Sequence, residues 1–548
     1  MDAYATVICY HEATRHRFEG YARGPQTLDW DAPPAPFRRY EGAPVQALPL
    51  AAAHFEAPFS RLQQPVHGPA VQAGPEALGA LLQLSFAISA WKSNGVERWA
   101  LRCNPSSGNL HPTEAYVLAH GIEGLADGVH HYRAEDHVLE RRADWLAAVG
   151  PPGLYLGLSS VIWREAWKYG ERAFRYCQLD VGHAVACIAY AAALLGWQVE
   201  AVPGLPSAAL ARLLGLDRHA DFTAGRRDEV EREEPELLLA LRTDLTGPAG
   251  PGVAGLGEAL PARARGARWH GRASAIDRHP MYRWPIIDEV AAATAGVGDA
   301  PCAVATEAGA PPPLTPADGG PGAVATILGR RSGQRYDIGG LMPASAFLHL
   351  LDATLARHQP PWQSLADAAR GALLLFVHRV DGLAPGLYLL LRDAATAPSL
   401  LAQLGPEFAA AGPVAGVDHL DLRLLRAIAP AGLRRIARSL CCHQDIAATA
   451  CFSLAMLAPF EPVLRRDASQ YRALLRAAGL VGQVLYLEAE ALGYRGTGIG
   501  CYFDDELHAL LGLQDRQWQS LYAFAIGVPL PDTRLETTAP YVGRPVAA

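Results

Sequence analysis

Three guanidinium groups and a hydroxyl fall within six residues of the 548-residue chain. The segment reads Leu328-Gly-Arg-Arg-Ser-Gly-Gln-Arg-Tyr-Asp337. Clustered cations need an anion, and arginine matches a phosphate group with parallel hydrogen bonds. A solvated basic turn explains the same residues. The segment alone therefore leaves a phosphate site and a basic turn equally open.

A second segment is rich in small hydroxyl and amide side chains: Arg102-Cys-Asn-Pro-Ser-Ser-Gly-Asn-Leu-His-Pro112. Its Pro and Gly residues predict a rigid loop whose donors and acceptors could rim a planar polar ligand. An ordinary Asx or Ser turn that caps residues 113–119 is the simpler interpretation. Without further information the turn is favoured.

A third segment, Arg495-Gly-Thr-Gly-Ile-Gly-Cys501, has three alternating glycines. Glycine lets backbone NH groups come close to a ligand. The segment follows a predicted helix rather than a first strand, so it is not a dinucleotide-binding fingerprint. By itself it is weak evidence for a site.

The elements that must position these segments occur twice along the chain. Residues 174–197 and 471–494 are each rich in Ala and Leu and predict long buried helices. They end at Gly196 and Gly493, which suit the left-handed conformation that closes a helix. The same offset relates two Leu-Leu-Gly-Leu segments, and each half ends in an apolar run that predicts a strand. The pattern predicts an α+β fold, repeated.

Two stretches rich in Gly, Pro and Ala, residues 246–275 and 300–322, have the composition of linkers. We therefore expect a first domain over residues 1–245, a linker over 246–319 and a second domain over 320–548. With 50% hydrophobic residues, the chain can bury the cores of two domains.

Charge and composition exclude several classes of protein. A net charge of −7, with no dense Lys/Arg stripe, argues against a nucleic-acid partner. The nine cysteines contain no CxxC and predict reduced, mostly buried thiols, not a disulfide framework or a zinc ribbon. Residues 1–20 do not resemble a secretory leader, and the longest apolar runs are too short to cross a bilayer. We expect a cytoplasmic protein.

Isolated polar residues carry little weight. His183, alone in an apolar helix, is typical of a satisfied core group, and His130 and His131 lack the partners of a metal site. The charged residues of 226–236 are most simply a solvated loop or helix face. No metal is expected.

Taken together, the three segments resemble the nitroreductase family, and more narrowly its SagB-type dehydrogenase branch. That branch includes flavin enzymes that oxidise azolines to thiazoles and oxazoles in peptides. The resemblance covers nearly the whole chain. It implies an FMN-dependent oxidoreductase built as two fused nitroreductase-like domains that form a pseudo-dimer, each with a central mixed or antiparallel sheet flanked by helices.

The resemblance also implies which residues contact FMN. The phosphate is expected on Arg330, Arg331 and Ser332, with Gln334 or Arg335 extending the contact and Arg534 supporting it. The flavin is expected to meet, from the other domain, the loop residues Arg102, Pro105, Ser106, Ser107 and Asn109. The turn Gly498, Ile499 and Gly500 is expected to lie against the isoalloxazine.

The two halves are complementary. The first half has the Ser-Ser-Gly-Asn loop and no Arg-Arg-Ser, whereas the second half has Arg-Arg-Ser and no such loop. At the constant offset, the turn 496–501 corresponds to residues 199–204, where the alternating glycines are missing. Family homodimers build two FMN sites across their interface. A fused pair with complementary losses should keep one complete site and one degenerate site.

A fourth segment, residues 167–176, resembles the Lys-Tyr motif of azoline dehydrogenases. It implies Lys168 and Tyr169 as catalytic residues, with a buried lysine of lowered pKa accepting a proton while hydride leaves to the flavin N5. The alternative is a packed aromatic helix start whose lysine reaches outward. The second half has Arg465-Arg466 at the offset position, so the fold does not require the Lys-Tyr pair.

These features predict oxidation of a heterocyclic or an amino-acid- or peptide-derived substrate, with NAD(P)H or O2 as a candidate redox partner. An NAD(P)H-dependent nitro- or quinone reductase is one alternative, since it needs only an open flavin face. A non-catalytic scaffold in a peptide-modifying complex, either flavin-binding or flavin-free, is another. The fused pair can act as a monomer or form a homodimer.

Overall fold

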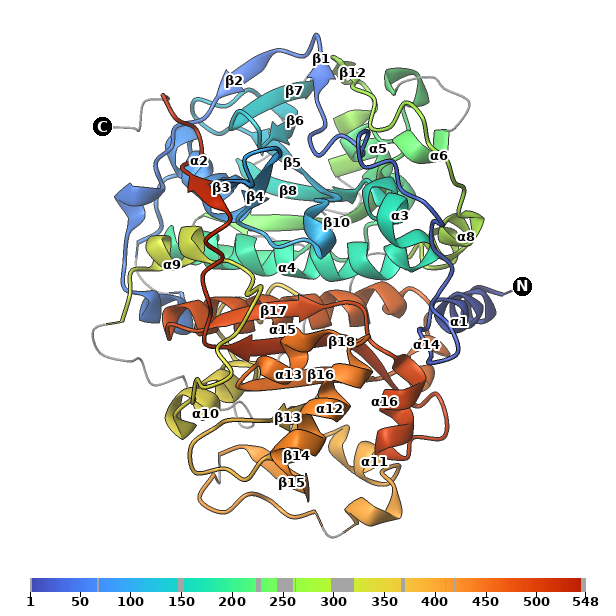
Figure 1. Cartoon of the computed structure of the whole chain (residues 1–548). Helices are drawn as coiled ribbons and strands as arrows, with labels where there is room; N and C mark the ends of the chain where they lie inside the picture. The colour runs from blue at the N-terminus through green and yellow to red at the C-terminus, as the bar shows by residue number, and fades with distance from the viewer. Residues whose placement is uncertain are drawn as a thin grey trace.

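The computed structural model describes residues 2–66, 69–145, 152–222, 228–243, 260–261, 263–296, 320–365, 370–409, 411–417 and 419–543. Two α+β halves stack on either side of a pair of long helices, α4 and α15 (Figure 1). The N-terminal half is blue to green in that view and lies above the helices. The C-terminal half is orange to red and lies below them.

The first half is built on an antiparallel sheet with the strand order β11-β7-β6-β5-β8-β10-β9, with β2 paired to β7. Its strands are β2 (Val45–Ala47), β5 (Thr113–His120), β6 (Gly128–Arg133), β7 (Val138–Asp144), β8 (Gly153–Ser160), β9 (Gln198–Ala201), β10 (Glu234–Arg242) and β11 (Arg268–Trp269). Its helices are α1 (Ala3–Ala13), α2 (Pro75–Ser85), α3 (Ile162–Tyr169), α4 (Ala173–Leu194), α5 (Ser207–Leu214), α6 (Asp228–Glu231) and α8 (Pro285–Ala293).

The second half is built on an antiparallel sheet with the order β15-β14-β13-β16-β18-β17. Its strands are β13 (Ala372–Val377), β14 (Gly386–Leu391), β15 (Asp421–Ala427), β16 (Phe452–Pro459), β17 (Arg495–Ile499) and β18 (Trp518–Gly527). Its helices are α9 (Ala323–Gly329), α10 (Ala344–Ala353), α11 (Ala397–Leu401), α12 (Pro430–Leu440), α13 (Asp445–Thr449), α14 (Glu461–Leu464), α15 (Gln470–Ala491) and α16 (Asp504–Leu511).

The two sheets match strand for strand from β7/β15 to β9/β17, which confirms the repeat and the α+β class. Helices α4 and α15 begin at 173 and 470, a difference of 297 residues (470 − 173). The same difference separates the start of β9 from that of β17 (495 − 198) and the start of α5 from that of α16 (504 − 207). Gly196 and Gly493 both take positive φ just past the long helices, as predicted.

The halves meet where α4 crosses α15 at two glycines that occupy equivalent positions. A Cβ at Gly182 would lie 2.0 Å from the carbonyl oxygen of Arg476, and a Cβ at Gly479 would lie 2.0 Å from that of Leu179. Residues 179 and 476 are themselves equivalent, so each helix contacts the other through the same positions. This reciprocity is that of a two-fold interface between subunits. The fused chain therefore reproduces the contact of a homodimer.

Smaller sheets join remote parts of the chain. The hairpin of β3 (Ile88–Ser93) and β4 (Arg98–Arg102) is extended by the C-terminal strand β19 (Glu536–Thr538). In Figure 1 the red C-terminal segment runs up from the second half to reach this hairpin. Strand β1 (Tyr40–Glu41) pairs with β12 (Arg272–Ala273). The C-terminal segment of the second half thus becomes part of the first.

The described part of the expected linker is built onto the first half. Strand β11 pairs with β7, β12 pairs with β1, and α8 lies against α1. Arg472 of α15 donates to the carbonyl oxygen of Ala291 at 2.8 Å and to the hydroxyl of Thr294 at 2.9 Å. Residues 260–296 therefore also contact the second half.

The interpretation of residues 226–236 as a solvated face was wrong. Glu231, Glu233, Glu234 and Glu236 are buried, and Glu231 and Glu233 pair with the buried Arg38. Arg226 lies outside the described residues. A run of charged residues can be buried when the fold brings oppositely charged side chains to it. Here those side chains come from distant segments of the chain.

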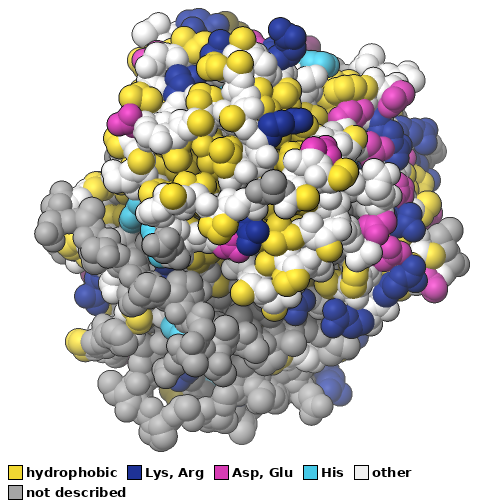
Figure 2. Space-filling model, turned by 90° about the horizontal axis from the view of Figure 1, so that it is seen from below, with side chains coloured by type: hydrophobic (Ala, Val, Ile, Leu, Met, Phe, Trp, Pro, Cys, Tyr) yellow, Lys and Arg dark blue, Asp and Glu magenta, His cyan; other side chains and the backbone are white. Residues whose placement is uncertain are grey.

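One stretch of the described chain, Ile162–Leu194, is long and apolar enough to cross a membrane by length and composition alone. Its apolar window is wholly buried inside the protein, as expected for a core helix. Seen from below, the described part of the surface intermixes basic and acidic side chains (Figure 2).

Candidate functional site

A cavity of about 420 Å³ opens between the two halves. It is lined by most of the residues that the sequence singles out: Arg102, Pro105, Ser106, Ser107, Asn109, Tyr169, Arg330, Arg331, Ser332, Gln334, Gly498, Ile499 and Gly500. The loop comes from the first half, whereas the Arg-Arg-Ser segment and the glycine turn come from the second. The structure thus brings the three segments to one cavity.

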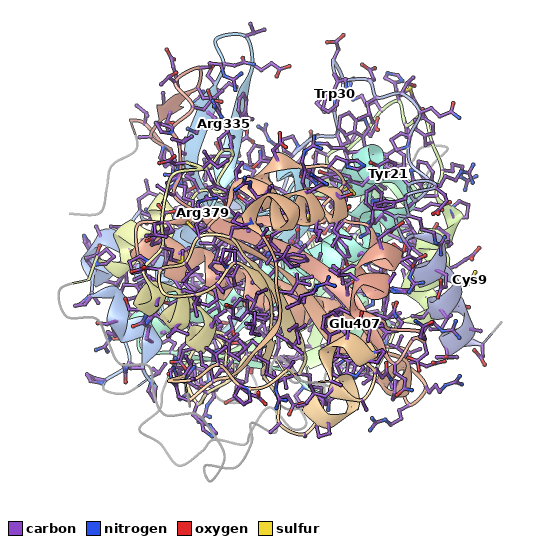
Figure 3. The ribbon with its side chains drawn as sticks, turned by 60° about the horizontal axis from the view of Figure 1, so that its bottom comes forward. Cys9, Tyr21, Trp30, Arg335, Arg379 and Glu407 are labelled. Atoms are coloured by element: carbon purple, nitrogen blue, oxygen red, sulfur yellow. The ribbon has the colours of Figure 1, made fainter. Side chains whose placement is uncertain are left out.

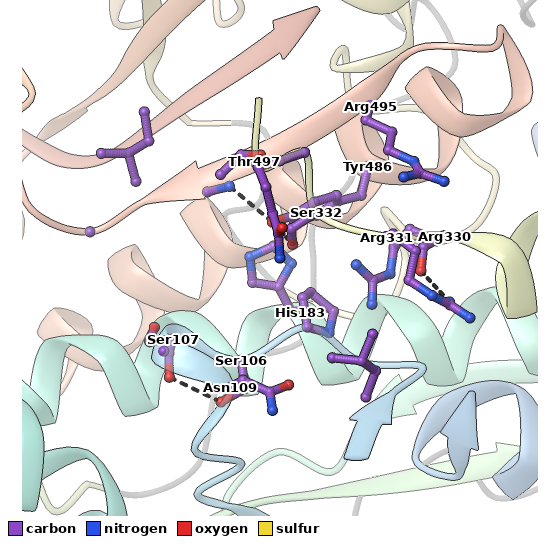
Figure 4. Close-up of a pocket in the computed structure, with 18 of the residues that line it drawn as sticks. Ser106, Ser107, Asn109, His183, Arg330, Arg331, Ser332, Tyr486, Arg495 and Thr497 are labelled. Carbon is purple, nitrogen blue, oxygen red and sulfur yellow. Dashed lines mark hydrogen bonds between the residues drawn. The ribbon is translucent and has the colours of Figure 1, made fainter. Parts of the chain in front are cut away.

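The arginines lie at one end of this cavity, to the right of the serine–asparagine loop in Figure 4. Arg330, which is 4% exposed, donates to the backbone oxygens of Cys103 at 3.3 Å and Arg102 at 3.1 Å. Arg331 donates to Ser89 Oγ at 3.2 Å. Burial and the charge of Arg330 lower the pKa of Arg331 to about 10. The second half thus anchors its cations on the first half.

Two further cations line the same end, and the sequence reasoning missed both. Lys92 projects from β3, and its pKa is lowered by burial and by the charges of Arg331 and Arg495. Arg495 begins β17 and lies 3.7 Å from Glu490. Arg495 could have been found because it opens the glycine segment. Lys92 could not, because nothing in the pattern of the hairpin distinguishes it.

These cations outnumber the acidic groups beside them. Glu490 accepts from the Arg331 backbone, and burial raises the pKa of its carboxyl. Asp532 also lines the cavity, but its carboxylate is held by Arg534. An excess of positive charge in a cavity is a physical reason to expect an anionic ligand there.

A chain of hydroxyl groups joins this end to the glycine turn. Ser332 Oγ lies 2.9 Å from the Tyr486 hydroxyl, which accepts from the backbone NH of Gly498 at 2.9 Å. The backbone NH of Gly333 donates to Gly496 at 2.9 Å. A Cβ at Gly498 would lie 1.9 Å from the hydroxyl of Tyr522. Glycine is therefore required for β17 to pass this ring.

The loop at the other end has a left-handed backbone at two residues other than glycine, Asn109 (φ 62°) and His111 (φ 54°). Asn109 Nδ2 donates to the carbonyl oxygen of Ala100 at 2.9 Å, and its Oδ1 lies 3.0 Å from His111 Nε2. Strain of this kind persists where surrounding contacts fix the loop, and it concentrates at functional sites. A simple capping turn does not need it.

A buried carboxyl pair, Asp180 and Glu165, lies behind the loop, and no sequence motif marks either residue. Asp180 of α4 accepts from the Ser107 backbone NH at 3.1 Å and from its hydroxyl at 3.0 Å. Burial raises the pKa of Asp180 to about 7 even though both serines of the loop stabilise its charged form. Glu165 of α3 lies 3.4 Å from Ser106 Oγ, and burial raises its pKa well above the usual range, with the charge of Asp180 adding to the effect.

Of the Lys168–Tyr169 pair, only the tyrosine lines the cavity. Tyr169 lines the cavity, and a Cβ at Gly108 would lie 2.4 Å from its hydroxyl. Lys168 does not line the cavity, and its ammonium lies 5.7 Å from the ring centre of Trp30. Burial lowers the pKa of Lys168, and the charge of Glu165 opposes that change. Lys168 thus reaches the cavity indirectly, through the charge of Glu165 and through the ring of Tyr169, whose centre lies 5.4 Å from its ammonium.

Two of the expected phosphate ligands do not line the cavity. Arg335 is exposed and lies on the side opposite Trp30 in the view of Figure 3. The side chain of Arg534 is 79% exposed and is held by Asp532. Arg102 does line the cavity, but one of its guanidinium nitrogens donates a hydrogen bond to the carbonyl oxygen of Pro36.

The cavity has the features that FMN needs. The cations of Arg330, Arg331, Lys92 and Arg495 suit a phosphate, and the glycine turn lets backbone approach a flat ring. Asn104 and His111 line the cavity, and their buried Oδ1 and Nδ1 atoms have no hydrogen-bond partner among the described residues. Buried polar atoms of this kind call for a ligand or water. Among the described residues no group of His, Cys, Asp and Glu could hold a metal ion.

The equivalent position on the other face of the α4–α15 pair is nearly filled. A cavity of about 40 Å³ is lined there by Ala201 and Val202, which correspond to Gly498 and Ile499 at the constant offset. Glu236 of β10 pairs with Arg472 at 3.2 Å and with Arg476 at 2.7 Å. Side-chain ion pairs occupy the space that is open in the larger cavity.

Comparisons with known proteins agree with this architecture. Residues 387–528 match the model of the Nitroreductase family. A protein of Methanocaldococcus jannaschii assigned as a nitroreductase is 29% identical over 104 residues, which are 17% of this chain and 52% of that protein. The chain therefore spans about half the length of this relative.

A crystal structure from Anabaena variabilis, of a protein assigned as a nitroreductase, matches 96% of this chain and 99% of its own, with 20% identity and a TM-score of 0.68. An Exiguobacterium sibiricum protein so assigned, in complex with FMN, matches 38% of this chain and 88% of its own, with 15% identity and a TM-score of 0.23. The full-length match shows the fold, which is that of two fused nitroreductase-like domains.

Proposed function

We propose that the chain is an FMN-dependent oxidoreductase that binds one FMN in the cavity between its halves. The observation that carries the proposal is the cavity itself. In it, an excess of cations from both halves lies beside a strained polar loop of the first half and a glycine turn of the second. The equivalent cavity is about a tenth as large and its charges are paired.

Arg330 and Arg331 would hold the phosphate, with Lys92, Arg495 and Ser332 beside them. Arg330 is fixed by two backbone oxygens of the first half, so little conformational entropy is lost when it meets an anion. Asn109, the orphan acceptor of Asn104 and the backbone of the glycine turn would meet the ring.

FMN would supply two-electron hydride chemistry, and the protein would supply the proton path. Asp180 lines the cavity, and its raised pKa lets it hold or release a proton near neutral pH. Ser106 and Ser107 join Asp180 to Glu165, whose charge in turn acts on Lys168. Tyr169 and Asp180 would therefore face the substrate, and Lys168 would act through Glu165.

Dehydrogenation of a heterocyclic or peptide-derived substrate is the reaction that the Tyr169–Asp180 pair supports best, since it needs a base beside the carbon that loses hydride. An NAD(P)H-dependent nitro- or quinone reductase is the second candidate. The position of Lys168 outside the cavity favours it, because a reductase has no need of a lysine base.

FMN titration of the purified chain tests the proposal. We expect saturation at one FMN per chain, read from flavin fluorescence and from the ratio of flavin to protein absorbance. Saturation at two per chain would contradict the single site, and absence of binding would favour the scaffold. Anaerobic mixing with NADPH then separates the two enzymes, because rapid bleaching of the flavin bands indicates the reductase.

A further inference from the structure

Two cysteines from separate elements meet at the wall of the cavity. Cys501 follows the glycine turn and lines the cavity, and Cys442 lies in the turn after α12. Their sulfur atoms are 2.6 Å apart. Both residues are partly exposed, whereas Cys103, Cys177, Cys187, Cys441 and Cys451 are buried. The pair is thus open to reagents that the buried thiols cannot meet.

The turn that carries Cys442 is held in a costly conformation. Cys442 (φ 50°) and His443 (φ 60°) both have a left-handed backbone, which is unfavourable for residues other than glycine. Gln444 Nε2 donates to the carbonyl oxygen of Cys501 at 3.2 Å, and the Phe503 backbone NH donates to Leu440 at 2.8 Å. These bonds tie the turn to the segment of Cys501 on both sides of the sulfurs.

The surroundings favour a thiolate on Cys501. Its pKa is lowered by the hydrogen bond from Cys442, and further by His16 and by the charge of Arg172. His16 Nδ1 accepts from the Ala22 backbone NH at 2.9 Å, so the ring proton of a neutral imidazole is on Nε2, the nitrogen left to donate to sulfur. Arg172 is fixed by Asp504 at 3.1 Å and by the Gly500 carbonyl oxygen at 3.1 Å.

We infer that Cys442 and Cys501 are a redox-active pair that exchanges with low-molecular-mass disulfides entering the cavity. The inference stands on the contact of the two sulfurs, the strained turn that holds it, and the opening of Cys501 to the cavity. It does not depend on flavin binding. The exposed rings of Phe18 and Tyr21 flank Phe503 next to the pair and offer an apolar rim to an organic disulfide. Tyr21 is labelled in Figure 3.

The exchange balances without any further reagent. The Cys501 thiolate attacks one sulfur of RS–SR, an S–S bond forms between them, and RS⁻ leaves and takes up a proton. Cys442 then loses its proton to solvent and attacks the Cys501 sulfur, which releases the second RS⁻. The protein pair is oxidised to a disulfide and RS–SR is reduced to two RSH. A small dithiol reverses both steps.

Oxidised glutathione is a suitable probe. The reduced full-length chain is mixed with it, quenched with N-ethylmaleimide at timed intervals and digested without reductant for peptide mass mapping. We expect a Cys442–Cys501 cross-link, release of two glutathione molecules per chain, and a rate about 10-fold or more above that of adduct formation on the exposed Cys9. Cys9→Ser is the matched control and should cross-link as the wild type does.

Single variants separate the two roles. Cys442→Ser should trap one glutathione on Cys501, because the resolving thiol is gone. Cys501→Ser should abolish the fast phase. A wild type that forms no cross-link overturns the inference, as does a Cys501 in Cys442→Ser that reacts no faster than Cys9. Should either variant unfold, the wild-type mapping still decides. FMN titration of the same samples reports on the flavin site separately, so one proposal can fail while the other stands.

Discussion

The two faces of the α4–α15 pair are built from corresponding elements, but the cavities on them differ in volume and in charge. On one face, Arg330, Arg331, Lys92 and Arg495 exceed their acidic neighbours around about 420 Å³ of open space. On the other face, two arginines meet two glutamates, and about 40 Å³ remains. Helices α4 and α15 have 22 residues each, start 297 residues apart (470 − 173) and contribute to both faces. The fold thus provides two possible ligand positions. Only the one with an excess of positive charge is suited to an anion.

Single positions show how the closed face was filled. Arg476 of α15 lines the small cavity, whereas its counterpart in α4, the buried Leu179, does not line the large one. Ala201 and Val202 replace Gly498 and Ile499, which removes the glycine that allows close backbone approach. Glu236 and Glu234 then neutralise Arg476 and Arg472. The residues that fill the closed face, and so exclude a ligand, also form ion pairs between the two halves.

The largest effect is expected from breaking this neutral network. Glu236→Leu removes the carboxylate that two buried guanidinium groups share and leaves their charge only partly compensated by Glu234, and we expect the free energy of unfolding to fall by about 3–5 kcal/mol. Denaturant unfolding measures it. Glu200→Gln on neighbouring β9 breaks a part-exposed pair with Arg242 and should cost less than about 1 kcal/mol. Equal losses in the two variants would show that Glu236 is not special.

A smaller loss is expected at the crossing that the two faces share. Gly182→Ala and Gly479→Ala each place a methyl group 2.0 Å from a backbone oxygen of the other helix. The helices must move apart, and we expect each variant to lose about 2–3 kcal/mol of stability, by similar amounts because the positions are equivalent. Gly432→Ala in α12, whose Cβ would lie 3.4 Å from Ile428 Cγ2, should change stability by less than about 1 kcal/mol in thermal unfolding. A large difference between the two interface variants would contradict the pseudo-symmetry.

Substitutions on the open face should change the affinity for FMN. Arg331→Ala removes a charge-assisted donor to the phosphate, and we expect FMN to bind about 10- to 100-fold more weakly, which is about 1.5–3 kcal/mol. Fluorescence titration measures the Kd. Arg534→Ala removes a charge of the same sign that does not line the cavity, and its Kd should stay within about threefold of the wild type. The reverse order of the two variants would move the phosphate site to the C-terminal segment.

The sequence predicted what depends on local pattern. The long helices, their closing glycines and the repeat follow from Ala/Leu content and one offset, and the segments holding Arg331, Asn109 and Gly498 were expected at one cleft. Asp180 was missed because a single acid in an apolar helix carries no pattern until the fold brings Ser107 to it. The glutamates of 231–236 were misjudged because their partners Arg38 and Arg472 lie 193 to 238 residues away in the sequence.

The last effect concerns Asp180 of the open face, whose counterpart at the constant offset is Ala477. Its folded-state pKa of about 7 exceeds the unfolded value near 4, so its protonated form stabilises the fold. That contribution is complete below pH 4 and is lost as pH rises through 7. Asp180→Asn should remove this slope, so that denaturant unfolding of wild type and variant diverges between pH 4 and 7. The exposed Asp31→Asn should follow the wild type throughout, and a parallel course of Asp180→Asn would mean that this carboxyl is ionised at all these pH values and cannot donate a proton in the cavity.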